Sequence, residues 1–297
     1  MEGDRRLTGA GSKDVGRDVA RAVEVFVRGF SVAKSGAHPY VPARVEAVWV
    51  MRDAPRRNEK RYRREEWVAH GLTPPEVDAV VRRHARGSFA VCPIRGLDEP
   101  AVPLRAAYKE LGYRLTGTEP LMIHRLARLP RVSSAGVAVK RVTTAPLADR
   151  LAAAAGSRRL PAEHLEADSP VRQYAALEGD AVVGWVQSIV VRLDPDAAAS
   201  SASPADGAGI APEPAAVPTS ADGAVMTWCS NMYVLESHRR RGIGRALLAR
   251  MLRDDRRHGA AASVLLASHA GARLYPVVGY EQIGELLAYS PRRRIDN

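Results

Sequence analysis

The residues best placed to do chemistry lie between Val225 and Arg257. An apolar run from Val225 to Val234 predicts a buried strand, and a polar stretch then leads into the turn Arg239-Arg240-Arg241-Gly242-Ile243-Gly244-Arg245, which opens a helical pattern. The first amide N–H groups of a helix have no partner inside it, and the helix dipole favours an anion there. Glycines let a phosphate approach the backbone, and the arginines add positive charge. The pattern therefore predicts a site for a pyrophosphate.

This turn matches neither of the two common nucleotide-binding signatures, because Leu247 replaces a third glycine and no Gly-Lys-Ser/Thr follows. Instead, Arg239-x-x-Gly242-x-Gly244 with Met232-Tyr233-Val234 upstream resembles motif A of the GNAT superfamily of N-acetyltransferases. The stretch 266–280, Leu-Ala-Ser-His-Ala-Gly-Ala-Arg-Leu-Tyr-Pro-Val-Val-Gly-Tyr, resembles that family's next motif. The resemblance covers roughly residues 137–289. It implies an acetyltransferase fold and coenzyme A binding, and it says nothing about the acceptor.

The resemblance also implies roles for individual residues. Acetyl-CoA would be the co-substrate, with no metal, and its binding residues would be Met232, Tyr233, Val234, Arg239, Arg240, Arg241, Gly242, Ile243, Gly244, Arg245 and Ser268. The backbone of the first three would contact the pantetheine arm and the thioester oxygen, and the arginine-rich turn would hold the pyrophosphate. Ser268 stands where many members have an asparagine. Tyr275 falls where the family places its general acid, although a tyrosine at such a position can also be a core residue with one wet end.

The general base is not assigned. Many members carry a glutamate on the strand before the turn or on the next strand, where this chain offers Cys229, Ser230 and Ser263. His269 and Glu236 lie near the motif ends and are further candidates. Cys229 could be an acyl-carrying nucleophile, but a buried thiol is the favoured interpretation.

Composition sets broader limits. The chain has 297 residues, of which 46% are hydrophobic, so it can form two domains of ordinary size or one large one. Its two cysteines lie in apolar runs and suggest reduced thiols, and neither a signal peptide nor an apolar run of about 18–20 residues is present. We therefore expect a soluble, cytoplasmic protein with no membrane partner. The net charge of +11 comes from arginine, with only five lysines among 44 basic residues. A basic surface can attract nucleic acid, but an arginine-rich composition is the favoured explanation.

In the N-terminal half, residues 1–13 are expected to be disordered. Apolar residues at helical spacing from Val19 to Phe30 predict a helix that ends near Gly29 or soon after, and Ala43–Met51 predicts a strand. The charged segment 52–66, flanked by aromatic residues, could bind nucleic acid, but its interleaved acids favour a loop with local ion pairs. Further predicted elements are a helix from Thr73 to Arg86, a strand at 88–94, a helix at 102–111 and an extended stretch from Gly112 to Leu126.

An internal repeat links the two halves. Tyr108-Lys109-Glu110-Leu111-Gly112-Tyr113 has the spacing of Tyr275-Pro276-Val277-Val278-Gly279-Tyr280, and each stretch lies between a predicted helix and a strand. We therefore predict two tandem acetyltransferase-like α/β domains, each a mixed, largely antiparallel sheet flanked by helices. Residues 14–128 would form a degenerate copy, 129–136 a linker and 137–297 the acetyl-CoA-binding domain. The Tyr-x-x-x-Gly-Tyr pattern could also recur by chance.

The C-terminal half is expected to alternate strands and helices around the turn. Strands are predicted at 137–142, 172–177, 181–193, 225–234, 262–267 and 282–289, and helices at 145–155, 243–257 and 270–278. The helix after the turn should bury Ile243, Leu247 and Met251 and expose Asp254. Residues 194–223, rich in Ala, Ser, Pro and Gly, are predicted to be a disordered insertion, either inert or a lid.

The function predicted from these features is acetyl transfer from acetyl-CoA to a primary amine of a small molecule. The crevice between the halves would hold the acceptor. Two alternatives remain open: an acyltransferase acting on a protein, carrier protein or aminoacyl-tRNA, and a non-catalytic sensor of acyl-CoA.

Overall fold

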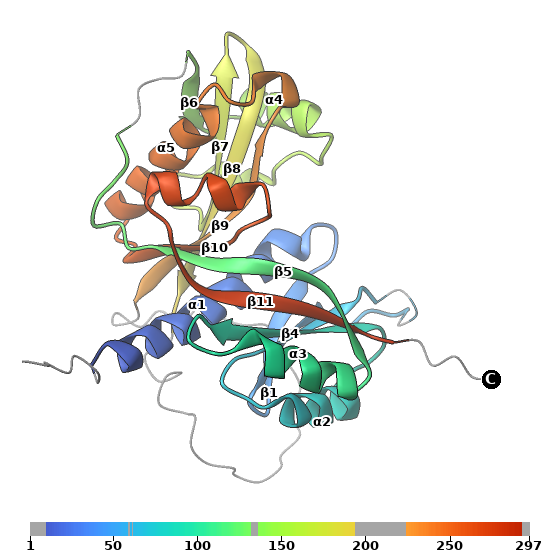
Figure 1. Cartoon of the computed structure of the whole chain (residues 1–297). Coiled ribbons are helices and arrows are strands. Elements are labelled where there is room, and N and C mark those ends of the chain that lie inside the picture. Colours follow the sequence, from blue (N-terminus) through green and yellow to red (C-terminus); the bar gives the residue numbers. More distant parts are fainter. Residues whose placement is uncertain (1–9, 59, 61, 132–135, 194–223, 293–297) are drawn as a thin grey trace, which may run out of the picture.

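The computed structural model describes residues 10–58, 60, 62–131, 136–193 and 224–292. Eleven strands form one sheet in the order β1-β2-β3-β4-β11-β5-β10-β9-β8-β7-β6, and every neighbouring pair is antiparallel except β3/β4 and β9/β10 (Figure 1). This mixed, largely antiparallel sheet flanked by helices confirms the predicted fold class. The predictions for residues 1–9, 132–135 and 194–223 concern parts of the chain outside the described residues.

The N-terminal half contains α1 (Ala10–Ser35), β1 (Tyr40–Val45), β2 (Val48–Asp53), β3 (Glu65–Ala69), α2 (Pro74–His84), β4 (Phe89–Gly96), α3 (Ala101–Glu110) and β5 (Tyr113–His124). The helix expected to begin after residue 13 and to end near Gly29 therefore starts earlier and runs six residues further. The strand expected at 43–51 is a hairpin of β1 and β2, and Glu46, with φ +53°, lies in its turn. Strand β3 was not predicted, and its first residues had been assigned to the charged loop at 52–66.

The C-terminal half contains β6 (Ala138–Arg141), α4 (Ala145–Ala155), η2 (Ala162–Leu165), β7 (Val171–Glu178), β8 (Ala181–Arg192), β9 (Val225–Val234), η3 (Glu236–His238), α5 (Ile243–Arg257), β10 (Ala262–Leu266), η4 (Gly271–Arg273), η5 (Pro276–Val278) and β11 (Glu281–Pro291). These agree with the predicted strands. The helix expected at 270–278 is instead two short 3-10 segments, because Pro276 has no N–H with which to continue a helix.

The two halves repeat the same order of elements. The series β3–α2–β4–α3–β5 matches β9–α5–β10–η4/η5–β11, and both series contain a parallel strand pair. Gly112 (φ +85°) and Gly279 (φ +96°) make the same left-handed turn before the last strand of each series. The internal repeat read from the sequence is thus present in the structure.

The last strands of the two series are exchanged. β5 lies between β10 and β11, and β11 lies between β4 and β5, so each half receives a central strand from the other. β5 and β11 pair antiparallel from Tyr113↔Pro291 to Ile123↔Glu281. The halves therefore share one continuous sheet, and the boundary at 129–136 remains a prediction.

Alternating residues of the strands send side chains to two different layers. In β4, Ala90 and Cys92 pack in the core that contains α1, whereas Val91 packs in the core that contains α2 and Tyr108 of α3. In β7, Ala175 packs with α4 and Tyr174 packs with α5. Because neighbouring strand residues point to opposite faces, α4 and α5 lie on opposite faces of the sheet.

Helix α1 crosses the middle of the sheet and contacts both halves. At Gly29 the helix backbone is so close to β9 that an added Cβ would lie 2.2 Å from Cβ of Trp228. This glycine therefore serves close packing and does not end the helix.

Helix α5 buries the predicted stripe of Ile243, Leu247 and Met251, but it also buries two acids. Asp254, expected to face water, is 5% exposed and pairs with Arg250 at 3.0 Å. Asp255 is fully buried and accepts hydrogen bonds from Arg172 (2.9 Å), Ser188 (2.7 Å) and Thr227 (2.9 Å), whose strands underlie the helix. This network fixes α5 on the sheet. None of the helices in the described part of the chain is long and apolar enough to cross a membrane.

Candidate functional site

Strands β9 and β10 separate at the site. They pair only from Met226↔Ala262 to Trp228↔Val264, so the second half of β9, from Cys229 to Val234, has no partner on that side. On its other side β9 pairs with β8 and contains a bulge. Between the pairs Ser230↔Gln187 and Tyr233↔Trp185, β9 has one residue more than β8. Asn231 lies within this bulge with φ +51°. The result is a gap in the backbone pairing of β9 and β10, called the slit below, beside a strand whose backbone is locally turned out of the ladder.

The predicted pyrophosphate turn lies at the start of α5, beside the slit. Gly242 is the N-cap at φ +82°, and no side chain caps the helix. A Cβ on Gly244 would lie 3.0 Å from Met232 Cε and 3.1 Å from Leu274 Cδ2. The first turn of α5 therefore has uncapped amide groups and packs closely against β9, as a cradle for an anion requires.

The four arginines of this turn differ in their contacts. Arg239 folds back to donate to the Val234 carbonyl at 3.1 Å and pairs with Glu236 at 3.2 Å. Arg241 pairs with Glu178 in the β7–β8 turn, which His238 also contacts at 3.0 Å. Arg240 and Arg245 are exposed and form no ion pair with a described residue. These two are the arginines left to meet a bound anion, whereas Arg239 and Arg241 hold the turn in place.

Tyr275 is 7% exposed and lies under the slit with Met232 and Leu247 in one core. Its ring contacts Tyr280, with centroids 5.6 Å apart. Burial raises the pKa of Tyr275, so the hydroxyl keeps its proton at neutral pH. Ser268 is exposed, and its Oγ accepts a hydrogen bond from the N–H of Gly271 at 3.2 Å.

The candidates for a general base are not brought together. Cys229 is buried, and desolvation raises the pKa of its thiol well above the ordinary value, which disfavours a nucleophilic thiolate. Ser263 is fully buried and bonded to the Tyr280 hydroxyl at 2.8 Å. Glu236 is engaged with Arg239, and His269 is exposed at the end of β10.

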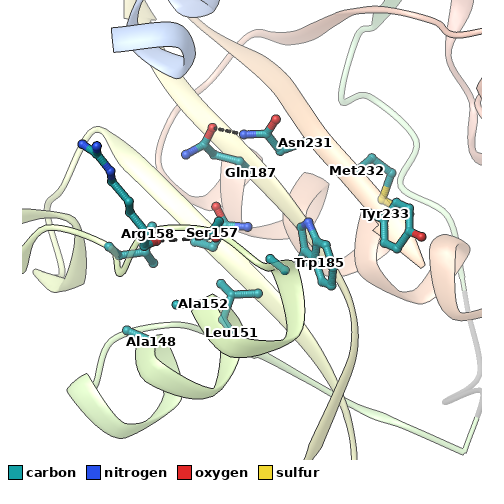
Figure 2. A pocket seen from close by; sticks show the side chains of 13 residues that line it. Ala148, Leu151, Ala152, Ser157, Arg158, Trp185, Gln187, Asn231, Met232 and Tyr233 are labelled. Carbon is teal, nitrogen blue, oxygen red and sulfur yellow. Dashed lines mark hydrogen bonds between the residues drawn. The ribbon is translucent and has the colours of Figure 1, made fainter. Parts of the chain in front are cut away.

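A cavity of about 430 Å³ opens on the α4 side of the sheet. One wall is α4 with Leu151, Ala152 and Ala155, and the other is formed by Gln173, Trp185, Gln187, Asn231, Met232 and Tyr233 of the strands (Figure 2). Because Asn231, Met232 and Tyr233 belong to the unpaired part of β9, the cavity adjoins the slit. The acceptor crevice was expected between the two halves, but this cavity lies wholly within the C-terminal half.

Trp185, Gln187 and Asn231 were not predicted as site residues from the sequence. Alternation along β8 placed Trp185 and Gln187 on one face, but it did not indicate which helix would cover that face. Asparagine at 231 was a usable signal, since it tolerates a left-handed backbone better than most residues.

The corresponding position in the N-terminal half is closed. β3 pairs with β4 along its whole length, so no slit forms. Helix α2 begins with Pro74 and Pro75, which have no N–H, and Glu76 accepts both the amide and the hydroxyl of Thr73 at 2.7 Å. This half therefore offers an anion neither free amides nor an opening.

Three arginines of the basic segment 52–64 are engaged in contacts within the protein. Asp53 is buried and pairs with Arg63 at 2.6 Å and Arg56 at 2.7 Å. Arg64 donates to Ser290 at 2.7 Å. The predicted local ion pairs are confirmed, but the segment is not a loop throughout, because β2 ends at Asp53 and β3 begins at Glu65. These pairs weaken the case for nucleic-acid binding.

Comparisons with known proteins agree with this geometry. The family described as an acetyltransferase (GNAT) domain matches residues 206–282. A GCN5-related N-acetyltransferase from Kribbella flavida matches at 16% identity and a TM-score of 0.56, covering 93% of this chain and 96% of that one. A protein of unknown function from Staphylococcus epidermidis matches at 13% identity and a TM-score of 0.51, covering 87% and 97%. No curated protein sequence matched.

Proposed function

We propose that the chain is a GNAT acetyltransferase that transfers an acetyl group from acetyl-CoA to a primary amine of a small molecule. The match of residues 206–282 to the acetyltransferase (GNAT) domain family and the shared fold support this proposal. The observation that carries the proposal is the slit between β9 and β10. It has the uncapped helix start of α5 on one side of the sheet and the 430 Å³ cavity on the other. A thioester held in the slit could meet an amine held in the cavity. We also expect the protein to act in the cytoplasm.

The residues present fit acetyl-CoA. Uncapped amides at Gly242 to Gly244 and the exposed guanidinium groups of Arg240 and Arg245 would hold the pyrophosphate. The unpaired backbone of β9 from Met232 to Val234 would bond the pantetheine arm and donate to the thioester oxygen. Ser268 would contribute a further contact only if its hydroxyl leaves the Gly271 amide.

Proton transfer would rest on Tyr275. Its hydroxyl stays protonated at neutral pH and lies in the core under the slit, where it would donate a proton to the departing thiolate. When bound, acetyl-CoA supplies the activated acyl group. The chain positions both reactants, which by itself lowers the barrier by several kcal/mol, about 7–11 in the most favourable cases.

A calorimetric titration with acetyl-CoA, with free CoA as the comparison, tests the first step, and thiol release across an amine panel tests the second. Gly244→Asp places a carboxylate where the pyrophosphate would lie and presses on Met232 and Leu274, so coenzyme binding should be lost while the thermal unfolding transition is kept. Preserved affinity in this variant would reject the cradle. Coenzyme binding without turnover of any amine would favour the sensor.

A further inference from the structure

The side chains that line the cavity carry almost no charge. Six of them are apolar or small residues of α4 and the loop that follows it, and Trp185 extends this apolar surface (Figure 2). Among the described residues that line the cavity, the only ionisable groups are the guanidinium of Arg158 and the phenol of Tyr233. No carboxylate from a described residue lines the cavity. A volume of about 430 Å³ is within the range of small-molecule sites.

The polar groups beside the slit are neutral amides held in one arrangement. Ser230 Oγ and Asn231 Nδ2 both donate to Gln187 Oε1, at 3.0 and 3.2 Å. This leaves Asn231 Oδ1 with no partner in the described part of the chain, at the bulge where β9 turns out of the ladder. An amide oxygen can accept a hydrogen bond from an amine N–H and so orient it, but it is far too weakly basic to remove a proton from an ammonium group.

Two consequences follow for an acceptor. The cavity offers a cationic amine no opposite charge, and Arg158 and the net charge of +11 oppose its entry. An amine that enters must also already be neutral, because the lining offers no carboxylate to deprotonate it. At pH 7.5 an alkylamine with a lysine-like pKa of about 10.4 is neutral in about one molecule per thousand, and a peptide α-amine with a pKa of about 7.8 in about one in three.

We propose that the acceptor is a weakly basic primary amine on an apolar or aromatic body, of the kind found at the α-position of a short peptide-like acid, with its carboxylate facing Arg158. This inference rests on the proposed acetyl transfer. Asn231 Oδ1 orients the amine toward the slit, the apolar wall of α4 and Trp185 holds the body, and Arg158, exposed on the loop after α4, attracts the carboxylate. The amine nitrogen attacks the thioester carbon, the C–S bond breaks and the amine proton passes to solvent. The leaving thiolate takes a proton from Tyr275, which regains a proton from solvent before the next turnover.

Four amines distinguish the effects of amine basicity, the carboxylate, the aromatic body and positive charge. Phe-Gly has a weakly basic α-amine and a carboxylate, Phe-Gly amide lacks only the carboxylate, phenethylamine keeps the aromatic body with a strongly basic amine, and spermidine is a polycation. Initial rates of thiol release should give Phe-Gly a kcat/KM at least about tenfold above phenethylamine, since the roughly 250-fold advantage in neutral amine is partly offset by weaker nucleophilicity. Phe-Gly should exceed its amide by about two- to fivefold, as one exposed charge pair allows.

The matched variants are Arg158→Gln and Arg159→Gln. Arg159 is the next residue, pairs with Asp149 at 2.8 Å and does not line the cavity. Arg158→Gln should remove the preference for Phe-Gly over its amide, and Arg159→Gln should keep it. A preference for phenethylamine or spermidine, or coenzyme binding with no turnover of any of the four amines, would overturn the acceptor class. Failure of acetyl-CoA to bind in the calorimeter would instead overturn the proposed function.

Discussion

The two unpaired arginines of the cradle make a quantitative prediction about coenzyme affinity. Arg240 and Arg245 are exposed and have no ion pair among the described residues, so their charge is available to a pyrophosphate at the start of α5. Two unit charges 4 Å apart interact by about 1 kcal/mol in water and about 4 kcal/mol at an effective dielectric constant of 20. For exposed side chains we take about 1–2 kcal/mol each. The double variant Arg240→Gln/Arg245→Gln should therefore raise the Kd for acetyl-CoA by between about 30-fold and about 700-fold.

The same helix provides the control. Arg253 is exposed, lies eight residues after Arg245 and is thus about 12 Å further along the axis, beyond the screening length of about 8–10 Å. Arg253→Gln removes the same charge and should leave the Kd unchanged. Calorimetry at low and high salt should show the loss shrinking as salt rises, and acetyl-pantetheine, which has no pyrophosphate, should bind all variants alike. An equal loss in Arg253→Gln, or no loss in the double variant, would refute the reasoning.

Four further outcomes are expected. Tyr275→Phe should lower kcat by about 10²–10⁴-fold with little change in coenzyme affinity, measured by steady-state thiol release and calorimetry. Gly242→Ala should lower the free energy of unfolding by about 1–2 kcal/mol, because φ is +82° at this position, and it should also weaken coenzyme binding. Gly71→Ala is the control, because φ is +72° and an added Cβ would meet nothing within 4 Å. It should lower the free energy of unfolding in urea by the same amount and leave coenzyme binding intact. Burial raises the pKa of Asp53, but hydrogen bonds and charge from its arginine partners outweigh this and hold the pKa below its ordinary value. Its stabilisation should therefore be fully present above about pH 4 and lost progressively as the pH falls towards the depressed pKa, so that Asp53→Asn costs about 3 kcal/mol at pH 7 and progressively less below about pH 4. Finally, calorimetry should give one coenzyme per chain, because the start of α2 is closed.

Each of these has an opposite result that counts against it. An unchanged kcat in the phenylalanine variant would remove the acid role of Tyr275. Loss of binding in both glycine variants would show that affinity follows stability alone. A stability difference for Asp53→Asn that stays constant with pH would mean that its charge does not stabilise the fold, and a stoichiometry of two would mean that the N-terminal half also binds.

The sequence predicted the local elements well, since periodicity and turn chemistry act over a few residues. The strand–turn–helix around Gly242 and the helix started by Thr73 are where they were expected. Elements whose limits depend on tertiary contact were predicted less well. Gly29 was assigned to a helix end, whereas its role is close packing on Trp228, a residue 199 positions away whose contact leaves no local signal.

The candidate site was predictable only in part. The glycine turn at the start of α5 was predictable from its residue types and their spacing. The cavity did not, because it depends on one extra residue in β9 and on α4 covering the face that carries Trp185 and Gln187. The different duties of Arg239 and Arg241 were also hidden, since their partners at Val234 and Glu178 are fixed by the folded turn.

The exchange of β5 and β11 bears on how this chain can fold. Strand β11 comes from the end of the chain and completes the sheet around β4, where Arg95 and Glu285, 190 residues apart, pair at 2.8 Å. During synthesis β4 therefore cannot pair with β11 until β11 has left the ribosome, and the edge of the sheet at β4 stays unpaired until then. Such long-range pairing slows folding. A chain cut between β5 and β6 would yield two fragments that are each short of a central strand. Neither should fold alone, but mixing them should restore the sheet through fragment complementation.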